Sequence, residues 1–385
     1  MQALEGSQAM AKAVGLCRPG VIAAYPITPQ THIVEHLADL VADGYLQAEY
    51  VSAESEFSAA SIVLGAASAG ARSFTATASQ GLAFMTEVLY NIAGLRVPLV
   101  LLCANRALSA PISIWNDHQD SMAVRDCGFI QLYCADNQEA IDTIIQAYKL
   151  SETLEMPVMV CVDGYTLTHT LEGLILPTQE MVDSFLPSYH FSRTLNAQSP
   201  LSLGMMVPPD YFTEVRFAHD QAMRQALETI EQLDQEWATI SGRSTGALLT
   251  SDRKDGAKLG ILTIGSIYGT FYDAWAEHDA LVDLFRLRAF RPFPAQALRE
   301  AVAHLDDLIV VERSFSPGAG GVIANEVRSA LSLLDQPPKV HAAVVGLGGR
   351  NVTLSTYDHI LKSYEQGVLR DFAIADRRQD LEIDL

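Results

Sequence analysis

The chain has 385 residues, a formal net charge of −20 at pH 7 and 49% apolar residues. This length exceeds the size at which one hydrophobic core usually keeps growing, so two domains are expected. The acidic balance excludes sequence-independent binding to nucleic acid or to anionic lipid, because both need clustered lysine and arginine.

The first residues, MQALEGSQAMAKAVG, have neither the basic start nor the apolar stretch of a secretory signal. No apolar run approaches the length that spans a bilayer, so a cytoplasmic protein is expected. The five cysteines are odd in number and form no CxxC pair. They predict buried thiols and no iron–sulfur cluster on this chain.

The first half of the chain alternates short apolar runs with segments of helical periodicity. The strand candidates are residues 20–24, 45–53, 71–79, 98–104, 129–135 and 157–164. This alternation predicts a parallel sheet with helices on both faces. Ligands of such sheets bind at the carboxyl ends of the strands, so the segments that follow each strand are the candidate site.

Residues 185–215 are rich in Pro, Ser and Tyr without periodicity and predict a long surface excursion. A helix is expected over about 217–237, before a polar connector. We therefore expect a first domain at 1–237, a linker at 238–257 and a second domain at 258–385. Strand candidates at 259–266, 281–288, 307–314 and 337–346 make the second domain a smaller α/β unit.

The stretch YPITPQT, residues 25–31, joins the first strand candidate to a helix. Thr28 is expected to cap that helix, with Pro29 in its first position. Alternatively, Pro26 and Pro29 fix Thr28 at the strand end so that its hydroxyl meets a ligand. The first role needs only an oxygen at position 28, whereas the second needs a hydrogen-bond donor.

Glu54 and Glu56 follow the second strand candidate and precede a helix rich in small residues. Acids in a first helical turn are common because the helix dipole favours them, and Ser52 or Ser55 can serve as the N-cap. A carboxylate at the mouth of a tightly packed sheet can alternatively share a proton with a ligand. The residues alone leave both interpretations open.

Two further strand ends carry small or polar residues. The small side chains of 75–81 permit close helix packing or the close approach of a ligand to the backbone. Arg106 leaves the next strand, where its guanidinium can meet a ligand carboxylate or form a structural ion pair. Asp117, His118 and Gln119 follow on a loop, and each taken alone favours a structural role.

Residues 32–36, HIVEH, match the H-x-x-E-H zinc motif, so a zinc hydrolase is an alternative function. On a helix His32 and His36 would share a face, as two zinc ligands must. No third ligand is evident, which makes the indication weak. In the second domain, glycine-bearing turns at 265–275 and 313–327 lead into helices whose N-termini either bind an anion or simply pack tightly.

Four motifs, taken in chain order, resemble the pyrimidine-binding domain of 2-oxoacid:ferredoxin oxidoreductases. They are YPITP, SE before a small-residue helix, TASQG, and Arg106 followed by SI-x-x-DHQD. The segments LRAFRPFPAQAL and SPGAGG resemble the transketolase C-terminal-type domain of that family. The resemblance covers nearly the whole chain. It implies an α/β fold in which a thiamine diphosphate-binding, pyrimidine-type parallel-sheet domain precedes a smaller transketolase C-terminal-like α/β domain.

The resemblance also implies residue roles. Glu56 aligns with the glutamate that activates the cofactor at N1′ of its aminopyrimidine ring. Thr28 and Arg106 match the pair that binds the carboxylate of the 2-oxo acid. No metal ligand is implied on this chain. The remaining implied contacts are Asp117, His118 and Gln119 with the substrate and Pro26, Ile27, Ser79 and Gln80 with the cofactor.

The implied protein is the alpha subunit of a pyruvate synthase-like, multi-subunit form, active only with its partners. Diphosphate and Mg²⁺ are expected on a beta subunit, and coenzyme A binding and iron–sulfur clusters on gamma and delta subunits. The expected reaction is oxidative decarboxylation of a pyruvate-like 2-oxo acid to acyl-CoA, with electrons passing to ferredoxin. The alternatives are a branched-chain or arylglyoxylate substrate with NAD as acceptor through a flavin subunit, and a non-catalytic scaffold.

Overall fold

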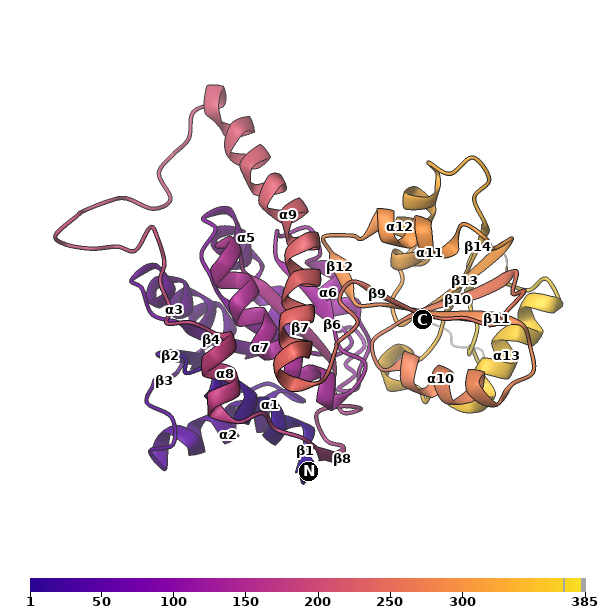
Figure 1. The fold of residues 1–385 in the computed structure, drawn as a ribbon, viewed down its shortest axis with the longest axis horizontal. Helices are drawn as coiled ribbons and strands as arrows, with labels where there is room; N and C mark the ends of the chain where they lie inside the picture. The colour runs from indigo at the N-terminus through magenta and orange to yellow at the C-terminus, as the bar shows by residue number, and fades with distance from the viewer. Residues whose placement is uncertain (370, 382–385) are drawn as a thin grey trace.

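The computed structural model describes residues 1–369 and 371–381 and arranges them around two large β-sheets (Figure 1). The first sheet has seven strands in the order β12-β6-β7-β5-β4-β2-β3, all parallel except β12, which pairs antiparallel with β6. Its strands are β2 (Val21–Ala24), β3 (Glu49–Ser52), β4 (Ser73–Thr77), β5 (Val100–Asn105), β6 (Ile130–Tyr133), β7 (Val158–Asp163) and β12 (Ala289–Arg291).

The second sheet has six strands in the order β15-β14-β13-β10-β11-β9, with only β9 antiparallel to its neighbour. A separate antiparallel pair joins β1 (Gln2–Glu5) to β8 (Leu171–Leu174). The second sheet consists of β9 (Leu249–Asp252), β10 (Leu259–Ile264), β11 (Val282–Leu287), β13 (Asp307–Glu312), β14 (Lys339–Val344) and β15 (Ala373–Ile374).

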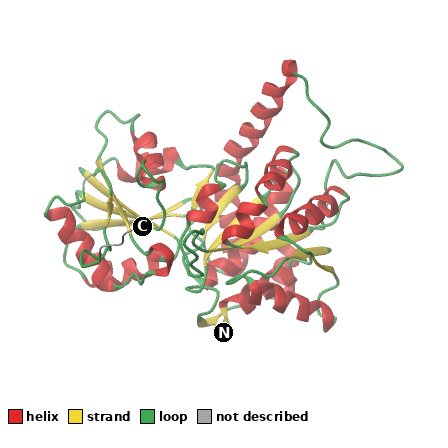
Figure 2. Ribbon diagram, turned by 180° about the vertical axis from the view of Figure 1, so that it is seen from behind, coloured by secondary structure: helices red, strands yellow, loops and turns green. Residues whose placement is uncertain are grey.

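Helices surround both sheets, as Figure 2 shows from behind. Those of the first half are α1 (Gly6–Leu16), α2 (Thr31–Ala42), α3 (Glu56–Ser68), α4 (Ser79–Phe84), α5 (Thr86–Gly94), α6 (Gln119–Ala123), α7 (Asn137–Leu154), α8 (Gln179–Phe185) and α9 (Pro209–Ser241). Those of the second half are α10 (Ile267–Glu277), α11 (Ala295–Val302), α12 (Val322–Leu331), the 3-10 turn η1 (Leu347–Gly349) and α13 (Leu354–Glu365). No helix in the described part of the chain has the length and apolar character needed to cross a membrane.

The central strand β5 shows why the apolar runs fold as they do. Val100, Leu102 and Ala104 enter one apolar cluster, while Leu101 and Cys103 enter another on the opposite face of the sheet. A strand covered on both faces requires a continuous apolar run rather than an alternating one. The predicted parallel-sheet α/β fold is therefore confirmed, and all five cysteines are free and buried, as predicted.

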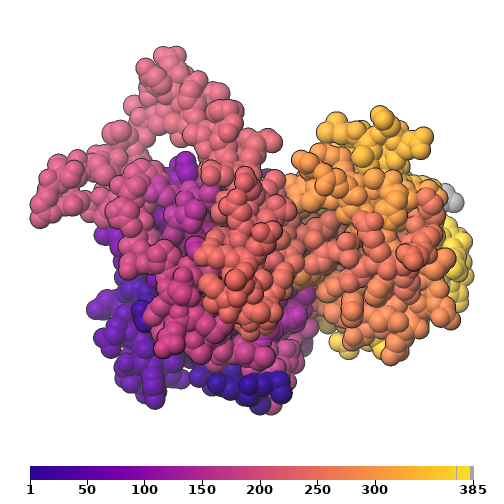
Figure 3. Space-filling model, viewed as in Figure 1, coloured from indigo at the N-terminus to yellow at the C-terminus, as the bar shows by residue number. Residues whose placement is uncertain are grey.

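The boundary between the two sheets differs from a simple linker. The expected linker 238–257 contains the last residues of α9, which ends at Ser241, and the whole of β9, which belongs to the second sheet. The chain then returns to the first sheet through β12. Residues 186–208 form no helix or strand, and Leu186 and Phe191 in their first part are buried in the apolar cores. Part of the segment and the first turns of α9 stand clear of the body (Figure 3).

A buried ion cluster joins the two sheets. Glu139 of α7 accepts hydrogen bonds from Arg286 of β11 and, at 3.0 Å, from Nε of Arg288. The guanidinium of Arg288 is fully buried and also donates to Thr143 and Gln146 of α7. Among the described residues, Glu139 is therefore the only carboxylate within ion-pair distance of the two arginines.

We expect Glu139→Gln to lower the free energy of unfolding by roughly 3 to 5 kcal/mol, because it leaves two buried guanidinium groups without a counter-charge. Chemical denaturation of the full-length chain measures this. The control is Asp220→Asn, which breaks the exposed Arg224–Asp220 pair on α9 and is expected to cost at most about 0.5 kcal/mol. Equal losses in the two variants would contradict a special role for the buried cluster.

Candidate active site

The segments that follow β2, β3, β4 and β5 meet at one edge of the first sheet. These four strands are neighbours in the order β5-β4-β2-β3 and run parallel. Their carboxyl ends therefore point the same way, which is where ligands bind in sheets of this kind. The segments are residues 25–31, 53–56, 78–81 and 106–120.

The turn after β2 contains a cis Thr28–Pro29 peptide bond, and α2 begins only after Gln30, its N-cap. The expected helix cap at Thr28, with Pro29 in the first helical position, is therefore wrong. The buried side chain of Gln30 holds the turn instead: its oxygen accepts from the backbone N–H of Ile27 at 3.2 Å, and its nitrogen donates to the carbonyl of Ala76 at 2.8 Å. Thr28 is exposed, and its hydroxyl has no partner among the described residues.

Glu56 is the first residue of α3, where Ser55 is the N-cap and accepts from the N–H of Ser58 at 3.2 Å. Only 8% of Glu56 is exposed, yet its carboxylate has no hydrogen-bond partner in residues 1–369 and 371–381. It lies against Gly81, where a Cβ would be 2.7 Å from Oε1 of Glu56 and 2.4 Å from Oγ1 of Thr77. The glycine therefore provides the space that the carboxylate occupies.

Glu54 differs from Glu56 in all these respects. Its side chain is exposed, and a hydrogen bond from the hydroxyl of Ser58 lowers its pKa. It is a solvated first-turn acid, so the structure separates the two glutamates that the sequence left as alternatives.

Arg106 follows directly on β5, and only 6% of it is exposed. Its Nη1 donates to the carbonyl of Thr28 at 2.9 Å and its Nε to that of Ser113 at 3.0 Å. Nη2 has no hydrogen-bond partner, and no carboxylate lies within ion-pair distance, among the described residues. The structural ion pair considered for Arg106 is thus not formed there, and a buried positive charge lies beside Thr28 without a counter-charge.

Asp120, the last residue of DHQD, organises these strand ends and was missed as a functional residue from the sequence. Its buried carboxylate accepts from the backbone N–H groups of Ser79, Arg106 and Ser121 at 2.8, 2.9 and 2.7 Å, and from the amide of Asn105 at 2.8 Å. Burial raises the pKa of Asp120, although these donors oppose the rise. The only sequence signal was a second aspartate in the motif.

Ser79 adopts a left-handed conformation with φ of 49° at the start of α4. Such a conformation costs a non-glycine residue on the order of 1 kcal/mol and persists where surrounding contacts impose it. Here the backbone of Ser79 is held by Asp120, and its hydroxyl donates to the carbonyl of Ala107. The turn brings Gly81 against Glu56, while the contact of Ser79 and Gln80 with a cofactor stays a prediction.

The loop residues expected over the pocket connect the two domains. The carboxylate of Asp117 accepts from the N–H of Gln119 at 3.0 Å and from that of Gly348, in η1, at 3.1 Å. The side chain of Gln119 accepts from the N–H of Phe315 at 2.8 Å. Each residue thus has a partner already, and its contact with a substrate stays a prediction.

His118 is completely buried between the domains rather than open to a ligand. Its Nε2 lies 2.5 Å from Oδ1 of Asp163, at the end of β7, and its backbone N–H donates to the carbonyl of Arg313. Burial disfavours the charged form of Asp163, but His118 and Arg313 hold its pKa well below the usual range. A substrate contact by His118 therefore stays a prediction, and the contacts seen are structural.

The two helix N-termini considered as anion sites are occupied by carboxylates of the chain itself. Asp163 accepts from the backbone N–H of Ser266 at the start of α10. Glu312 accepts from the N–H groups of Ile323 and Ala324 at the start of α12, and burial raises its pKa to about 7. Neither turn is therefore open to an external anion.

Comparison with known proteins identifies both halves of the chain. Residues 12–235 match the family model of the thiamine diphosphate-binding domain of pyruvate flavodoxin/ferredoxin oxidoreductases, and residues 253–357 match core domain II of pyruvate:ferredoxin oxidoreductase. The pyruvate synthase subunit PorA of Methanosarcina barkeri is 40% identical over 100% of this chain and 98% of its own. PorA of Methanocaldococcus jannaschii is 43% identical over 95% of each chain.

A more distant relative is the ketoisovalerate oxidoreductase subunit VorA of Pyrococcus abyssi, 36% identical over 91% of this chain and 90% of its own. Among solved structures, 2-oxoglutarate:ferredoxin oxidoreductase from Magnetococcus marinus has a TM-score of 0.72 at 20% identity, covering 94% of this chain and 65% of that one. A split-gene transketolase has a TM-score of 0.53 at 12% identity, covering 92% and 94% of the two chains. Together the matches confirm the family and the fold that the sequence predicted.

Asp117 predicts a pH-dependent stability. Burial raises the pKa of its carboxyl from 3.8 to about 6, although two backbone N–H groups oppose the rise. The folded chain therefore binds this proton more tightly, and the resulting stabilisation is full below the unfolded pKa and is lost as the pH rises to about 6. We expect Asp117→Asn to reduce the decline in the free energy of unfolding across this pH range by roughly 3 kcal/mol, measured by urea unfolding.

The control for this prediction is Asp39→Asn, which removes one exposed carboxyl from α2. The wild type and Asp39→Asn should share the decline. The same pH slope in Asp117→Asn would show that Asp117 is not its source.

Proposed function

This chain belongs to the pyruvate flavodoxin/ferredoxin oxidoreductase family, and we propose that it is the alpha subunit that binds the 2-oxo acid, and one end of thiamine diphosphate, in a pyruvate synthase. The observation that carries this proposal is the buried guanidinium of Arg106, which has no counter-charge among the described residues. A buried charge without a partner is strongly unfavourable, so its environment suits an anionic ligand.

The carboxylate of the 2-oxo acid is that ligand. Arg106 is anchored through Nη1 and Nε to the carbonyls of Thr28 and Ser113, which leaves Nη2 free to donate. The hydroxyl of Thr28 supplies a second donor beside it. Because the guanidinium of Arg106 is held by two hydrogen bonds, one of them to the carbonyl of Thr28, before the substrate arrives, little ordering of these groups is left to the binding step.

Glu56 fits the aminopyrimidine end of thiamine diphosphate. A nearly buried carboxylate without a partner, beside a glycine that clears space for it, suits a ring nitrogen with which it can share a proton. Thiamine diphosphate, when bound, supplies the centre that stabilises the negative charge left when carbon dioxide departs. Glu56 then holds the proton at N1′, and Pro26, Ile27, Ser79 and Gln80 are the proposed contacts around the ring.

The remaining functions are assigned to partner subunits. The five cysteines of this chain are buried free thiols, so iron–sulfur clusters are proposed on gamma and delta chains, and the diphosphate with Mg²⁺ on a beta chain. Pyruvate and coenzyme A give acetyl-CoA, carbon dioxide, one proton and two electrons, which pass through the clusters to ferredoxin. Pyruvate is favoured as the substrate because the PorA relatives are 40% and 43% identical and the VorA relative 36%.

We expect Glu56→Gln to slow pyruvate-dependent reduction of a viologen dye by the assembled complex by about 10²- to 10⁴-fold, because the amide cannot take up the proton. Glu54→Gln is the matched control, since it makes the same change two residues away on an exposed side chain. It should retain wild-type activity. Undiminished turnover in Glu56→Gln would remove this residue from the reaction.

We expect Arg106→Ala to raise KM by an amount equivalent to roughly 2 to 5 kcal/mol, because the charge-assisted contact to the substrate carboxylate is lost. Steady-state kinetics with pyruvate and with ketoisovalerate measure this, and both KM values should rise because both acids carry that carboxylate. Arg224→Ala, on the exposed face of α9, is the control. An unchanged KM in Arg106→Ala would contradict the carboxylate site, and a higher wild-type kcat/KM for ketoisovalerate would overturn pyruvate as the substrate.

A further inference from the structure

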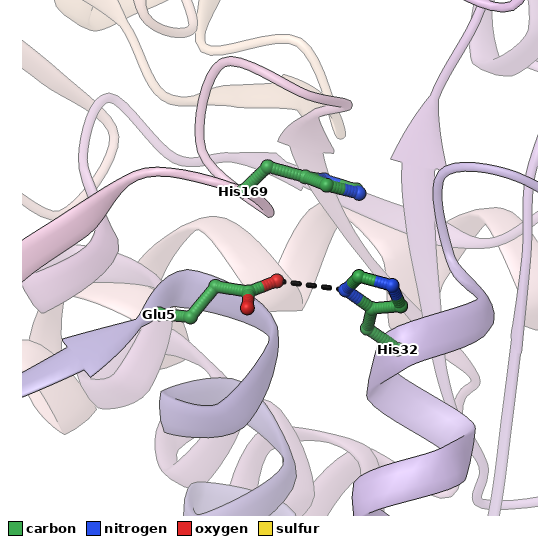
Figure 4. A group of neighbouring side chains, drawn as sticks. All are labelled: Glu5, His32 and His169. Atoms are coloured by element: carbon green, nitrogen blue, oxygen red, sulfur yellow. Dashed lines mark hydrogen bonds and ion pairs between the residues drawn. The ribbon is translucent and has the colours of Figure 1, made fainter.

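Three side chains of types that can ligate a metal ion come together from three distant segments of the chain (Figure 4). Glu5 ends β1, His32 lies in the first turn of α2, and His169 lies in the turn between β7 and β8. Nδ1 of His32 is 2.9 Å from Oε1 of Glu5. One ligand atom from each residue lies within 4.8 Å of the other two, and no other such group of three occurs in the described residues.

We propose that Glu5, His32 and His169 form a binding site for a divalent transition-metal ion of the zinc class. Two imidazoles and a carboxylate are a ligand set that zinc accepts, with the fourth position left to water. Tetrahedral bonds of about 2.0 to 2.1 Å place ligand atoms about 3.4 Å apart, so a pair at the 4.8 Å limit must close by about 1.4 Å. The two imidazole rings, which lie 4.8 Å apart at their centroids with an interplanar angle of 35°, must also turn so that a nitrogen of each faces the ion. The side chains of His32 and Glu5 are 45% and 32% exposed, which permits this adjustment and the entry of the ion.

A hydrogen bond to one ring nitrogen of His169 suits a histidine that ligates a metal through its other nitrogen. Oγ1 of Thr168, a buried residue, lies 2.7 Å from Nδ1 of His169 and also accepts from the backbone N–H of Tyr165. A hydrogen bond at Nδ1 fixes the ring and leaves Nε2 for the ion, as the outer partners of metal-bound histidines do. The net charge of −20 also favours a cation.

The HIVEH motif contributes only its first residue to this cluster. Neither Glu35 nor His36 belongs to it, so the paired zinc ligands of a hydrolase are not assembled in the described chain. The ligands come instead from segments that only the fold brings together. An ion here would tie β1 and the turn before β8 to the first turn of α2, just after the turn that carries Thr28.

Isothermal titration of the metal-free, tag-free full-length chain with zinc chloride tests the proposal. We expect one equivalent to bind, and at least about tenfold weaker binding in His32→Ala and in His169→Ala. Thr168→Val, which keeps all three ligands, should weaken binding by about 10- to 100-fold. Cobalt added in place of zinc should give the visible absorption of a tetrahedral site. The matched control, His36→Ala, removes the other histidine of the motif and should bind as the wild type does.

Absence of zinc binding by the wild type at micromolar concentrations would overturn the proposal. So would an equal loss in His36→Ala, because the ion would then use a different set of ligands. Circular dichroism of each variant verifies that the loss is not one of folding. Because the readout is binding and not turnover, its failure leaves the proposed decarboxylase function untouched, and the converse also holds.

Discussion

The candidate site depends on one buried carboxylate. Asp120 accepts hydrogen bonds from the backbone of Ser79, from the backbone of Arg106 and from the side chain of Asn105. These donors belong to the ends of β4 and β5, so separating them would leave a buried carboxylate without its partners, at a substantial cost in free energy. The left-handed turn at Ser79 brings Gly81 against Glu56, while the fixed backbone of Arg106 lets its guanidinium reach Thr28.

The same loop also couples the site to the second domain. Immediately before Asp120, His118 contacts Asp163 and the backbone of Arg313, and Gln119 contacts Phe315. Glu139 joins the domains again through Arg286 and Arg288. The second domain therefore holds the loop that follows Arg106 in place through these contacts. This explains why His118 and Gln119, which were expected at the substrate, are found between the domains.

The ten strands predicted from the sequence are all present. Most of them are apolar runs buried on both faces, which can be recognised without knowledge of the fold, whereas β3 is a partly exposed edge strand. Strands β1, β8, β9, β12 and β15 were not predicted, since none of these segments of two to four residues lies in a long apolar run. Within the site, the residues alone indicated Glu56 and Arg106 but could not choose between a ligand role and a structural one. The structural role was that of a first-turn helix acid for Glu56 and of an ion pair for Arg106. That choice required the structure, which shows that neither side chain has a carboxylate or hydrogen-bond partner of the expected structural kind among the described residues. The roles of Gln30 and Asp120 likewise became evident only from their hydrogen bonds in the structure.

The uncompensated guanidinium of Arg106, at the end of β5, is proposed to receive the carboxylate of a 2-oxo acid. The most direct test is a high-resolution structure of the assembled complex with pyruvate bound. We expect a carboxylate oxygen within hydrogen-bond distance, about 2.7 to 3.2 Å, of Nη2 of Arg106 and of the hydroxyl of Thr28. A carboxylate bound elsewhere, with Arg106 paired to an acidic side chain of a partner subunit, would contradict it.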